Sequence, residues 1–257
     1  MGIREVRFAK TTKLEMEIDS SSPSIIRDPN KCILCRRCIA VCMKVQSVSA
    51  IDSMNRGKLT KISTFMDKGL GNVDCINCGQ CLLVCPTGAL TENSHIRGVW
   101  NALADPAKVV LVETAPAVRA SIGEEFGMAP GSLATGKMAA ALRRLGFNKV
   151  FDTQFSADLT IMEEGHELIS RIKNKGPLPL ITSCSPGWIK FAEHFYPKVF
   201  EHISSCKSPQ QMFGAVAKTY YAQKLNIDPR NITVVSIMPC TAKKFEAQRP
   251  EMDSAFE

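Results

Sequence analysis

The sequence lacks any run of 18 apolar residues, so we expect no membrane-spanning helix. Residues 1–18 alternate charged and apolar side chains and lack the apolar core of a secretory signal. No basic stripe interleaved with aromatic residues is present, which gives nucleic-acid binding little support and favours a solvated face for the lysines and arginines. These absences predict a cytoplasmic protein with neither membrane nor nucleic acid as a partner.

Cysteine is abundant, and eleven cysteines without a secretory signal favour metal binding over disulfides. Eight of them form two runs spaced C-x2-C-x2-C-x3-C, namely Cys32, Cys35, Cys38, Cys42 and Cys75, Cys78, Cys81, Cys85. This pattern is typical of two [4Fe–4S] clusters that exchange their fourth ligands. One cluster would then use Cys32, Cys35, Cys38 and Cys85, and the other Cys75, Cys78, Cys81 and Cys42.

Three alternatives for these cysteines are disulfides, structural zinc and unliganded core thiols. Disulfides do not explain two identical runs, and zinc sites normally use paired C-x2-C hooks rather than triplets. Cluster binding also changes the charge of the chain. The formal net charge of +7 counts every cysteine as neutral. Eight thiolates and two oxidised cubane cores of about +2 each lower it to about +3.

Three regions differ in composition. Residues 1–23 form a leader with a possible β-pair, REVRF and KLEMEI, and a loop signal at its end. Residues 24–98 hold both cysteine runs. Within them, 32–51 and 75–90 form an internal repeat in which a short helix and an apolar strand (SVSAI, ALT) follow the cysteines. Residues 107–257 alternate strands and helices, which predicts a parallel α/β sheet.

The expected elements of the third region are strands at 108–113, 149–155, 178–183 and 231–239, and helices at 131–146 (with Ser132 as N-cap), 156–174 and 209–225. Cys184 and Cys240 each follow one of these strands. Functional groups gather at the carboxyl ends of parallel strands, so the two thiols could converge on one metal centre. The alternative is that each is a small buried hydrophobe.

Two segments resemble the first two signature motifs of the [FeFe]-hydrogenases: 182–188, reading TSCSPGW, and 238–246, reading MPCTAKKFE. Residues 207–211 (KSPQQ) and 114–119 (TAPAVR) are similar to stretches that line the active site of that family. The resemblance extends from about residue 2 to 250. It is closest to subunits that work with NAD(P)-linked flavoprotein and iron–sulfur subunits or ferredoxin, often in electron-bifurcating enzymes.

The resemblance implies reversible conversion of H2 to two protons and two electrons at an H-cluster, a [4Fe–4S] cubane bridged to a two-iron unit. It implies that Cys240 is a cubane ligand, that Cys184 passes protons to the two-iron unit, and that Lys243 hydrogen-bonds a cyanide ligand. It also implies a surrounding shell that fixes the two-iron unit, formed by Ala115, Pro116, Ala117, Ser208, Pro209, Gln210, Met238 and Pro239. Ordinary core packing is the alternative for this shell.

Glu164, Glu167 and Arg171 share one helix face because they are spaced i, i+3 and i+7. A solvated, salt-bridged face is the usual fate of such charges. The resemblance instead implies a proton-transfer chain that links these three residues and Ser204 to Cys184.

The sequence departs from the family pattern at two points. Ser185 stands where the family usually has a second cysteine, a cubane ligand, and either Ser185 itself or Cys206 would have to replace that thiolate. The third signature motif is absent, so we expect a fragment that is inactive alone. The expected fold is an α+β ferredoxin-like domain with two [4Fe–4S] clusters, followed by part of an α/β parallel-sheet catalytic lobe. Alternative functions are a non-catalytic polyferredoxin and a hydrogenase-like iron–sulfur assembly factor.

Overall fold

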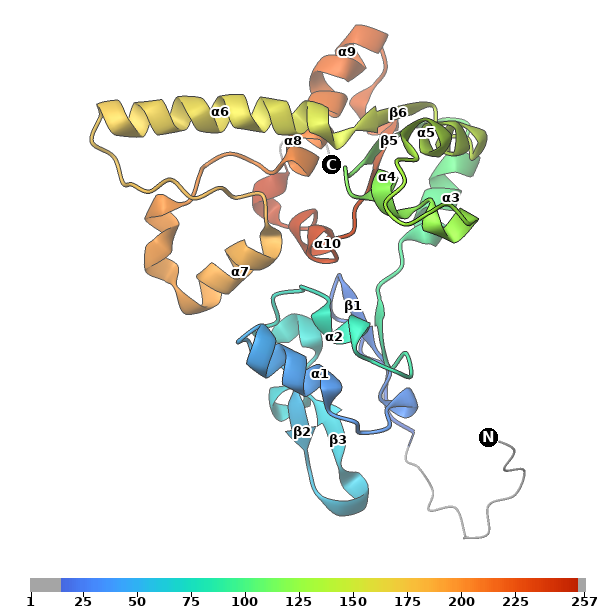
Figure 1. The fold of residues 1–257 in the computed structure, drawn as a ribbon, viewed down its shortest axis with the longest axis vertical. Helices are drawn as coiled ribbons and strands as arrows, with labels where there is room; N and C mark the ends of the chain where they lie inside the picture. The colour runs from blue at the N-terminus through green and yellow to red at the C-terminus, as the bar shows by residue number, and fades with distance from the viewer. Residues whose placement is uncertain (1–14, 254–257) are drawn as a thin grey trace. The chain divides into compact units, whose positions relative to one another are not determined.

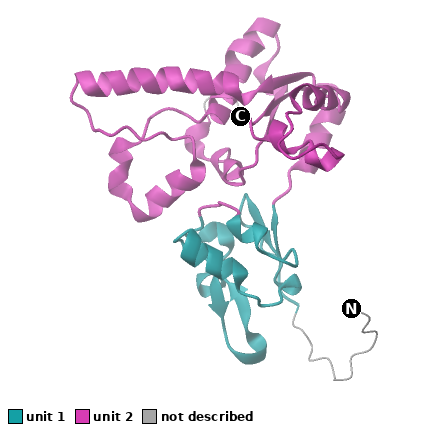
Figure 2. Ribbon diagram, viewed as in Figure 1, with its two compact units in different colours: residues 1–75, 80–92 teal, residues 76–79, 93–257 magenta. Residues whose placement is uncertain are grey.

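The computed structural model describes residues 15–253, which divide into two compact units (Figure 2). Of the described residues, 15–75 and 80–92 belong to unit 1, and 76–79 and 93–253 belong to unit 2. Among the described residues, no helix combines the length and the apolar character that a membrane span requires. The predicted strand REVRF lies outside the described residues, and the described part of KLEMEI, residues 15–18, forms no strand.

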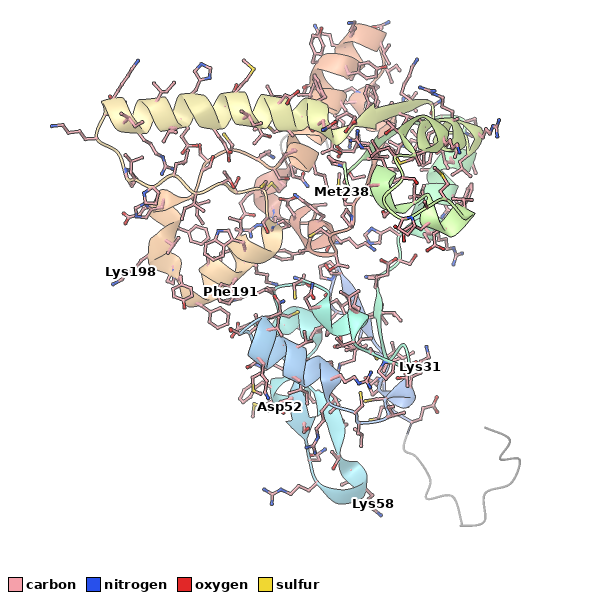
Figure 3. The ribbon with its side chains drawn as sticks, in the orientation of Figure 1. Lys31, Asp52, Lys58, Phe191, Lys198 and Met238 are labelled. Atoms are coloured by element: carbon pink, nitrogen blue, oxygen red, sulfur yellow. The ribbon has the colours of Figure 1, made fainter. Side chains whose placement is uncertain are left out.

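Unit 1 consists of short elements around a small core (Figure 1). Its elements are β1 (Ile25–Arg27), α1 (Arg37–Ala40) with a following π-helical turn (Val41–Val45), β2 (Asp52–Met54), β3 (Lys61–Ser63), α2 (Gln80–Leu83) and β4 (Leu90–Glu92). The strands form two antiparallel pairs, β1 with β4 and β2 with β3, and Figure 3 labels Lys58 in the loop that joins β2 to β3. The buried core consists of isoleucine and leucine side chains together with Cys38 and Cys75.

The backbone repeats in the cysteine turns and in the short helices α1 and α2, although SVSAI of the first half forms no strand. Leu34 and Arg36 in the first run have left-handed φ angles of 58° and 60°, and Asn77 and Gly79 have 57° and 72° at the same offsets in the second run. Such angles cost about 1–2 kcal/mol for residues other than glycine, so equal turns in both runs indicate that the cysteine geometry imposes them.

Unit 2 contains one parallel sheet in the order β6–β5–β7. Its strands are β5 (Val109–Thr114), β6 (Lys149–Asp152) and β7 (Ile232–Ile237). Its helices are α3 (Ile96–Ala104), α4 (Val118–Ser121), α5 (Thr135–Arg144), α6 (Thr153–Lys173), α7 (Pro186–Phe195), α8 (Pro209–Val216), α9 (Ala222–Leu225) and α10 (Ala242–Glu246).

The central strand β5 is covered on both faces, as its unbroken apolar run predicts. Val110 and Val112 pack against Met138 and Leu142 of α5 on one face. On the other face, Leu111 belongs to a second cluster that includes Phe213 of α8 and Ala222 of α9. Burial of each such side chain stabilises the fold by about 1.5–3 kcal/mol, so the side chains of β5 contribute strongly to the stability of unit 2.

Two predicted strands are wrong for identifiable backbone reasons. Residues 178–183 form no strand, because Pro179 has no N–H to donate, and only Ile181 makes a bridge, with Ile203. SVSAI is not a strand either, because Ser47 and Ser49 have φ angles of 55° and 56°, and β2 begins only after it.

Two helix starts differ from expectation. Helix α5 begins at Thr135 with Ala134 at the N-cap position, so Ser132 is not its cap. Helix α6 begins at Thr153, three residues earlier than predicted, because the Asp152 side chain accepts a hydrogen bond from the backbone N–H of Gln154 and so ends β6.

Candidate functional site

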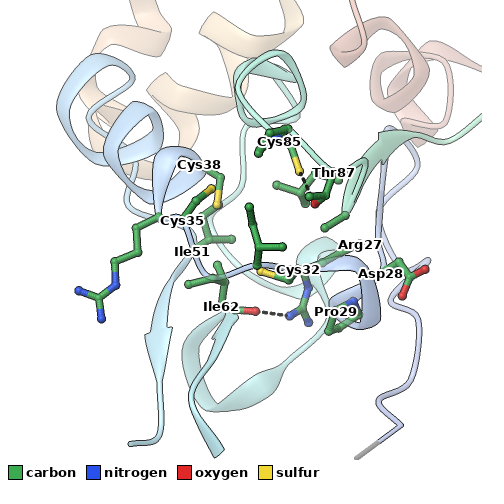
Figure 4. Close-up of a pocket in the computed structure, with 15 residues that line it drawn as sticks. Arg27, Asp28, Pro29, Cys32, Cys35, Cys38, Ile51, Ile62, Cys85 and Thr87 are labelled. Carbon is green, nitrogen blue, oxygen red and sulfur yellow. Dashed lines mark hydrogen bonds between the residues drawn. The ribbon is translucent and has the colours of Figure 1, made fainter. Parts of the chain in front are cut away.

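Four cysteines from both runs line one cavity in unit 1 (Figure 4). They are the set that the ligand-exchange rule assigns to one cluster: Cys32, Cys35, Cys38 and Cys85. The remaining lining is largely apolar and includes Ile51, Ile62 and Leu90. Such a pocket offers four thiols and a dry wall, which fits a [4Fe–4S] cluster.

The thiols of this cavity differ in acidity. Burial, with the neighbouring Cys32, Cys35 and Cys85, raises the pKa of Cys38 to about 11. Burial also acts to raise the pKa of Cys85, but hydrogen bonds from the Thr87, Leu90 and Ala89 backbone outweigh it and lower that pKa. Cluster binding would have to displace the Cys38 proton, because iron binds the thiolate.

The second set of cysteines lies in two sequence segments. Cys42, Cys75 and Cys81 belong to the core of unit 1. Cys78 lies in the segment 76–79, which is part of unit 2. There the Thr241 hydroxyl donates a hydrogen bond of 2.8 Å to the Asn77 carbonyl. The loop that carries Cys78 therefore packs on the turn that follows Cys240.

All eleven cysteines are free thiols. Within residues 15–253, no three His, Cys, Asp or Glu side chains are close enough to hold a single metal ion. A zinc ion would hold four thiolates at about 2.3 Å each, and hence close to one another.

Cys240 and Lys243 line a cavity of about 560 Å³ along β7, together with Gln210, Ser236 and Met238. Figure 3 labels Met238 in the segment that leaves this strand. The Gln210 Oε1 atom is buried without a hydrogen-bond partner among the described residues. Leaving a buried polar atom unpaired costs about 1–3 kcal/mol, as expected where a bound group completes the site. The thiol and the ammonium fit an anionic metal group, whereas the amide oxygen of Gln210 accepts hydrogen bonds and would pair with a donor.

Lys243 connects the two signature segments. Its Nζ atom donates to the Cys184 carbonyl at 3.0 Å and to Glu246 Oε2 at 2.8 Å. Glu246 is 3% exposed and also accepts a hydrogen bond of 3.0 Å from the hydroxyl of Ser208, the N-cap of α8. Sequence reasoning omitted Glu246, although its i+3 spacing from Lys243 in a helix predicts the ion pair.

Cys184 does not follow a strand of the sheet, contrary to expectation, because residues 178–183 are not a strand. The Cys184 thiol is exposed and its Sγ lies 3.8 Å from the Thr182 hydroxyl. Ser185 is the N-cap residue of α7, and its side chain makes no capping hydrogen bond. The Ser185 hydroxyl is therefore available to a ligand.

The structure brings Arg171, Glu167 and Ser204 together. Arg171 Nη2 lies 2.6 Å from Glu167 Oε1, and the Ser204 hydroxyl donates to Glu167 Oε2 at 2.8 Å. Burial acts to raise the pKa of Glu167, but the hydrogen bonds from Ser204, Arg171 and Ser205 lower it. Both charged side chains are under 20% exposed, so this is not a solvated surface pair. Glu164 is not joined to the group, and its buried Oε1 atom has no partner among the described residues.

Cys206 faces the same group. Its Sγ lies 4.0 Å from Glu167 Oε2, and its carbonyl accepts a hydrogen bond from the Ser183 hydroxyl. Burial and the nearby carboxylates of Glu167 and Glu164 raise the pKa of the thiol. Cys206 therefore connects the Glu167 network to the segment that carries Cys184.

Glu113 is a buried carboxyl that the sequence did not identify. It is 0% exposed and accepts hydrogen bonds from Thr153 at 2.9 Å and Ser236 at 2.7 Å. Burial raises its pKa to about 7, although these hydrogen bonds and the charge of Lys243 oppose the shift. No sequence signal marks it, because a carboxyl at the end of an apolar strand usually reaches solvent.

The remaining predicted residues lie in the segments that follow β5 and β7 and at the start of α8. Ala115 is buried directly after β5, and Ser208 is buried at the start of α8. The intermediate or exposed ones are Pro116, Ala117, Pro209 and Pro239.

Comparison with known proteins finds two family matches and several similar chains. Residues 108–257 match the family described as iron only hydrogenase large subunit, C-terminal domain. Residues 22–91 match the ferredoxin-like domain of NADH-quinone oxidoreductase subunit 3. The chain is 55% identical to the NADP-reducing hydrogenase subunit HndD of Solidesulfovibrio fructosivorans over 97% of its length, and 49% identical to iron hydrogenase 1 of Clostridium pasteurianum over 92%. It spans only 44% and 41% of these relatives.

A more distant relative has a different name. The cytosolic iron-sulfur assembly component 3 of Bos taurus is 34% identical over 70% of this chain and 40% of its own. Among solved structures, a variant of [FeFe]-hydrogenase HydA1 from Chlamydomonas reinhardtii matches with a TM-score of 0.61 and 48% identity. That match covers 64% of this chain and 42% of the algal one.

Proposed function

The chain belongs to the iron-only hydrogenase family, and from that premise we propose that it relays electrons and protons in the interconversion of H2 with protons. The observation that carries the proposal is the position of Lys243. Its ammonium joins the segments of Cys184 and Cys240 beside a cavity that also contains the unpaired Gln210. A charged donor forms a stronger hydrogen bond with an anionic metal group than a neutral donor does.

The two cysteine runs would hold two [4Fe–4S] clusters that pass electrons singly. An H-cluster held partly by Cys240 would supply the chemistry of H2 cleavage. Lys243 would then orient it by a hydrogen bond. The shell formed by Ala115, Pro116, Ala117, Ser208, Pro209, Met238 and Pro239 would exclude water.

Protons would reach the site through Glu167 and Cys184. Arg171 and Ser204 hold the Glu167 carboxylate in place. The Oε1 atom of Glu164 has no partner among the described residues, so a bridging water could connect Glu164 to this network. The Cys206 thiol faces Glu167, which supports a place for Cys206 in this network. In that arrangement Ser185, whose hydroxyl makes no capping bond, is left to replace the usual cubane thiolate.

The relative named as an NADP-reducing hydrogenase subunit supports similar partners for this chain, namely an NAD(P)-linked flavoprotein, iron–sulfur subunits or ferredoxin. We place the protein in the cytoplasm of an anaerobic cell. The second candidate function is iron–sulfur cluster assembly, which the similarity to assembly component 3 favours. The Glu167–Arg171–Ser204 network argues against it, because assembly requires no proton-transfer chain.

A chimera tests the choice between the two functions. Residues 1–257 replace the matching part of Solidesulfovibrio HndD, which is 55% identical, and the protein is matured anaerobically. We expect H2-dependent dye reduction, and we expect Glu167→Gln to lower its rate more than Glu163→Gln, an exposed neighbour on the same helix. A chimera that binds iron but never turns over H2 would favour the assembly function.

A further inference from the structure

Two thiols hold no metal in the proposed function. Eight cysteines form the two runs and Cys240 lines the cavity along β7, which leaves Cys184 and Cys206. Cys184 is exposed and Cys206 is half-buried. They lie in the segments that precede α7 and α8, and both segments belong to unit 2. Two free thiols in neighbouring segments can undergo a joint oxidation that a single thiol cannot.

The two segments run side by side in parallel. Ile181 and Ile203 form a parallel bridge, which two backbone hydrogen bonds of 2.7 and 2.8 Å hold together. Three residues further along both segments, the same register sets Cys184 opposite Cys206. The Ser183 hydroxyl donates to the Cys206 carbonyl, so the segments are still in contact there. Neighbouring strands lie about 4.7–4.9 Å apart, within the range of about 4.4–6.8 Å that separates the Cα atoms of a disulfide.

The two cysteine side chains also point to the same side of this pair. The side chains of Ser204 and Cys206 both face Glu167 Oε2, with the Ser204 hydroxyl at 2.8 Å and the Cys206 Sγ at 4.0 Å. Thr182 and Cys184 are their register partners, and the Thr182 hydroxyl lies 3.8 Å from Cys184 Sγ. Side chains at equivalent positions of a parallel pair share a face. Cys184 and Cys206 therefore share the face that carries Thr182 and Ser204.

A bond between these two thiols requires little rearrangement. The bridge between Ile181 and Ile203 already closes the loop that contains α7, so the remaining entropy cost of closure is small. Residues 182–185 and 204–208 do not continue as strands beyond the bridge. Their backbones can therefore adjust to the specific geometry that a disulfide requires.

We propose that Cys184 and Cys206 form a reversible disulfide when the chain meets a low-molecular-weight disulfide such as oxidised glutathione. Cys184 Sγ attacks the oxidant, whose S–S bond breaks and releases one thiol. Cys206 Sγ then attacks Cys184 Sγ in the mixed disulfide and releases the second thiol. The two cysteines lose two electrons and two protons, and the two released thiols carry them away.

The disulfide switches off the delivery of protons through Cys184. In the oxidised chain this residue has no S–H proton to transfer, and reduction by a dithiol restores it. This consequence rests on the proposed function, whereas formation of the disulfide depends only on the position of the two thiols.

The test uses the 257-residue chain with its clusters reconstituted anaerobically, so that the thiols outside the two runs are the reactive ones. After treatment with oxidised glutathione, the chain is alkylated, digested with trypsin and mapped by mass spectrometry. Cys184, Cys206 and Cys240 lie in separate tryptic peptides, 176–190, 199–207 and 231–243. We expect the first two peptides to be linked. Alkylation of their cysteines should fall about tenfold or more below that of Cys240, because the fold gives the two thiols a high effective concentration. Dithiothreitol should reverse the link.

In C206S, Cys184 should retain glutathione as a mixed disulfide, because the second thiol is missing. Treatment in concentrated urea should remove the preference for the Cys184–Cys206 link, because the unfolded chain no longer holds the two segments together. A wild-type chain that retains glutathione on Cys184, or that links Cys184 to Cys240, would overturn the proposal. A chain that binds no iron would contradict the cluster content of the proposed function, and its peptide map would still decide whether the disulfide forms.

Discussion

At the residue scale, Glu113 is a carboxyl buried without an ion pair among the described residues, and its two hydrogen-bond donors are hydroxyls. Its pKa is about 7 in the folded chain, against an ordinary value of 4.5. The folded state therefore holds this proton more tightly than the unfolded state does. The resulting stabilisation is complete below about pH 4.5 and is lost as the pH rises through about 7.

We predict that Glu113→Gln abolishes this part of the pH dependence. The amide keeps both hydrogen bonds but cannot ionise, so the variant should exceed the wild type in stability at pH 8 by at most about 3 kcal/mol. Urea unfolding of the reduced chain between pH 5 and 8 measures the difference. Glu125→Gln, on an exposed 3-10 turn, is the control. Parallel curves for wild type and Glu113→Gln would contradict the assignment.

Sequence reasoning reached some of these residues and not others, for physical reasons. The ion pair of Glu167 with Arg171 follows from helical spacing, which local geometry enforces. The contact of Lys243 with the Cys184 carbonyl joins residues 59 positions apart, and only the fold places them together. Glu113 was missed because its burial depends on the start of α6 and on β7, which supply Thr153 and Ser236.

At the scale of elements, Arg171 fixes the end of α6 to the loop beside it. Its guanidinium donates to Glu167 and to the backbone carbonyls of Pro177, Glu201, His202 and Ile203. A guanidinium carries five N–H donors in a rigid plane, whereas an ammonium carries three on a flexible chain. This contact, rather than a strand, holds the segment that leads to Cys184.

Arg171→Lys should accordingly lower the free energy of unfolding by about 1–3 kcal/mol, because several backbone carbonyls lose a charged donor. Amide hydrogen exchange in residues 177–183 should accelerate in the same variant. Arg144→Lys, an exposed change near the end of α5, provides the matched control. Equal effects of the two substitutions would show that the hydrogen bonds of Arg171 do not support the loop.

Gly79 tests the close approach of the second cysteine loop to Thr241. A Cβ atom at Gly79 would lie 2.5 Å from Thr241 Oγ1, and the φ angle of Gly79 is +72°. Gly131 has a φ angle of +75° and open space around it. We predict that Gly131→Ala costs about 1 kcal/mol of backbone strain and that Gly79→Ala costs more, because the clash is added. Equal shifts in the thermal midpoints of the two variants would contradict this, because they would show that the Thr241 side chain moves aside at no cost in stability.

Element types were predictable where the pattern was long and unbroken. The apolar run of β5 and the amphipathic stretch of α6 appear as expected. The wrong strands, 178–183 and SVSAI, failed on single backbone features, a missing proline N–H and two left-handed serines. Such backbone features prevent strand formation even where the hydrophobic pattern favours it, because they remove hydrogen bonds that pair one strand with the next.

At the scale of the whole molecule, the crossed arrangement of the cysteine runs makes a specific prediction. Cys85 belongs to the second cysteine run, but Cys85→Ala should damage the cluster at Cys32, Cys35 and Cys38 of the first run. Iron should fall from about eight atoms per chain toward about four, with loss of one reduced EPR signal. Cys206→Ala serves as a control that should leave this iron in place. Retention of the first cluster in Cys85→Ala would make the crossed assignment wrong.

The central claim is that Cys240 binds the hydrogen-converting metal centre while Cys184 delivers protons to it. Infrared spectra of the matured chimera, taken beside H2 assays, test this most directly. We predict CO and CN bands in the chimera, the same bands with most turnover lost in Cys184→Ala, and no bands in Cys240→Ala. Bands that persist without Cys240, or that vanish with Cys184, would contradict the account.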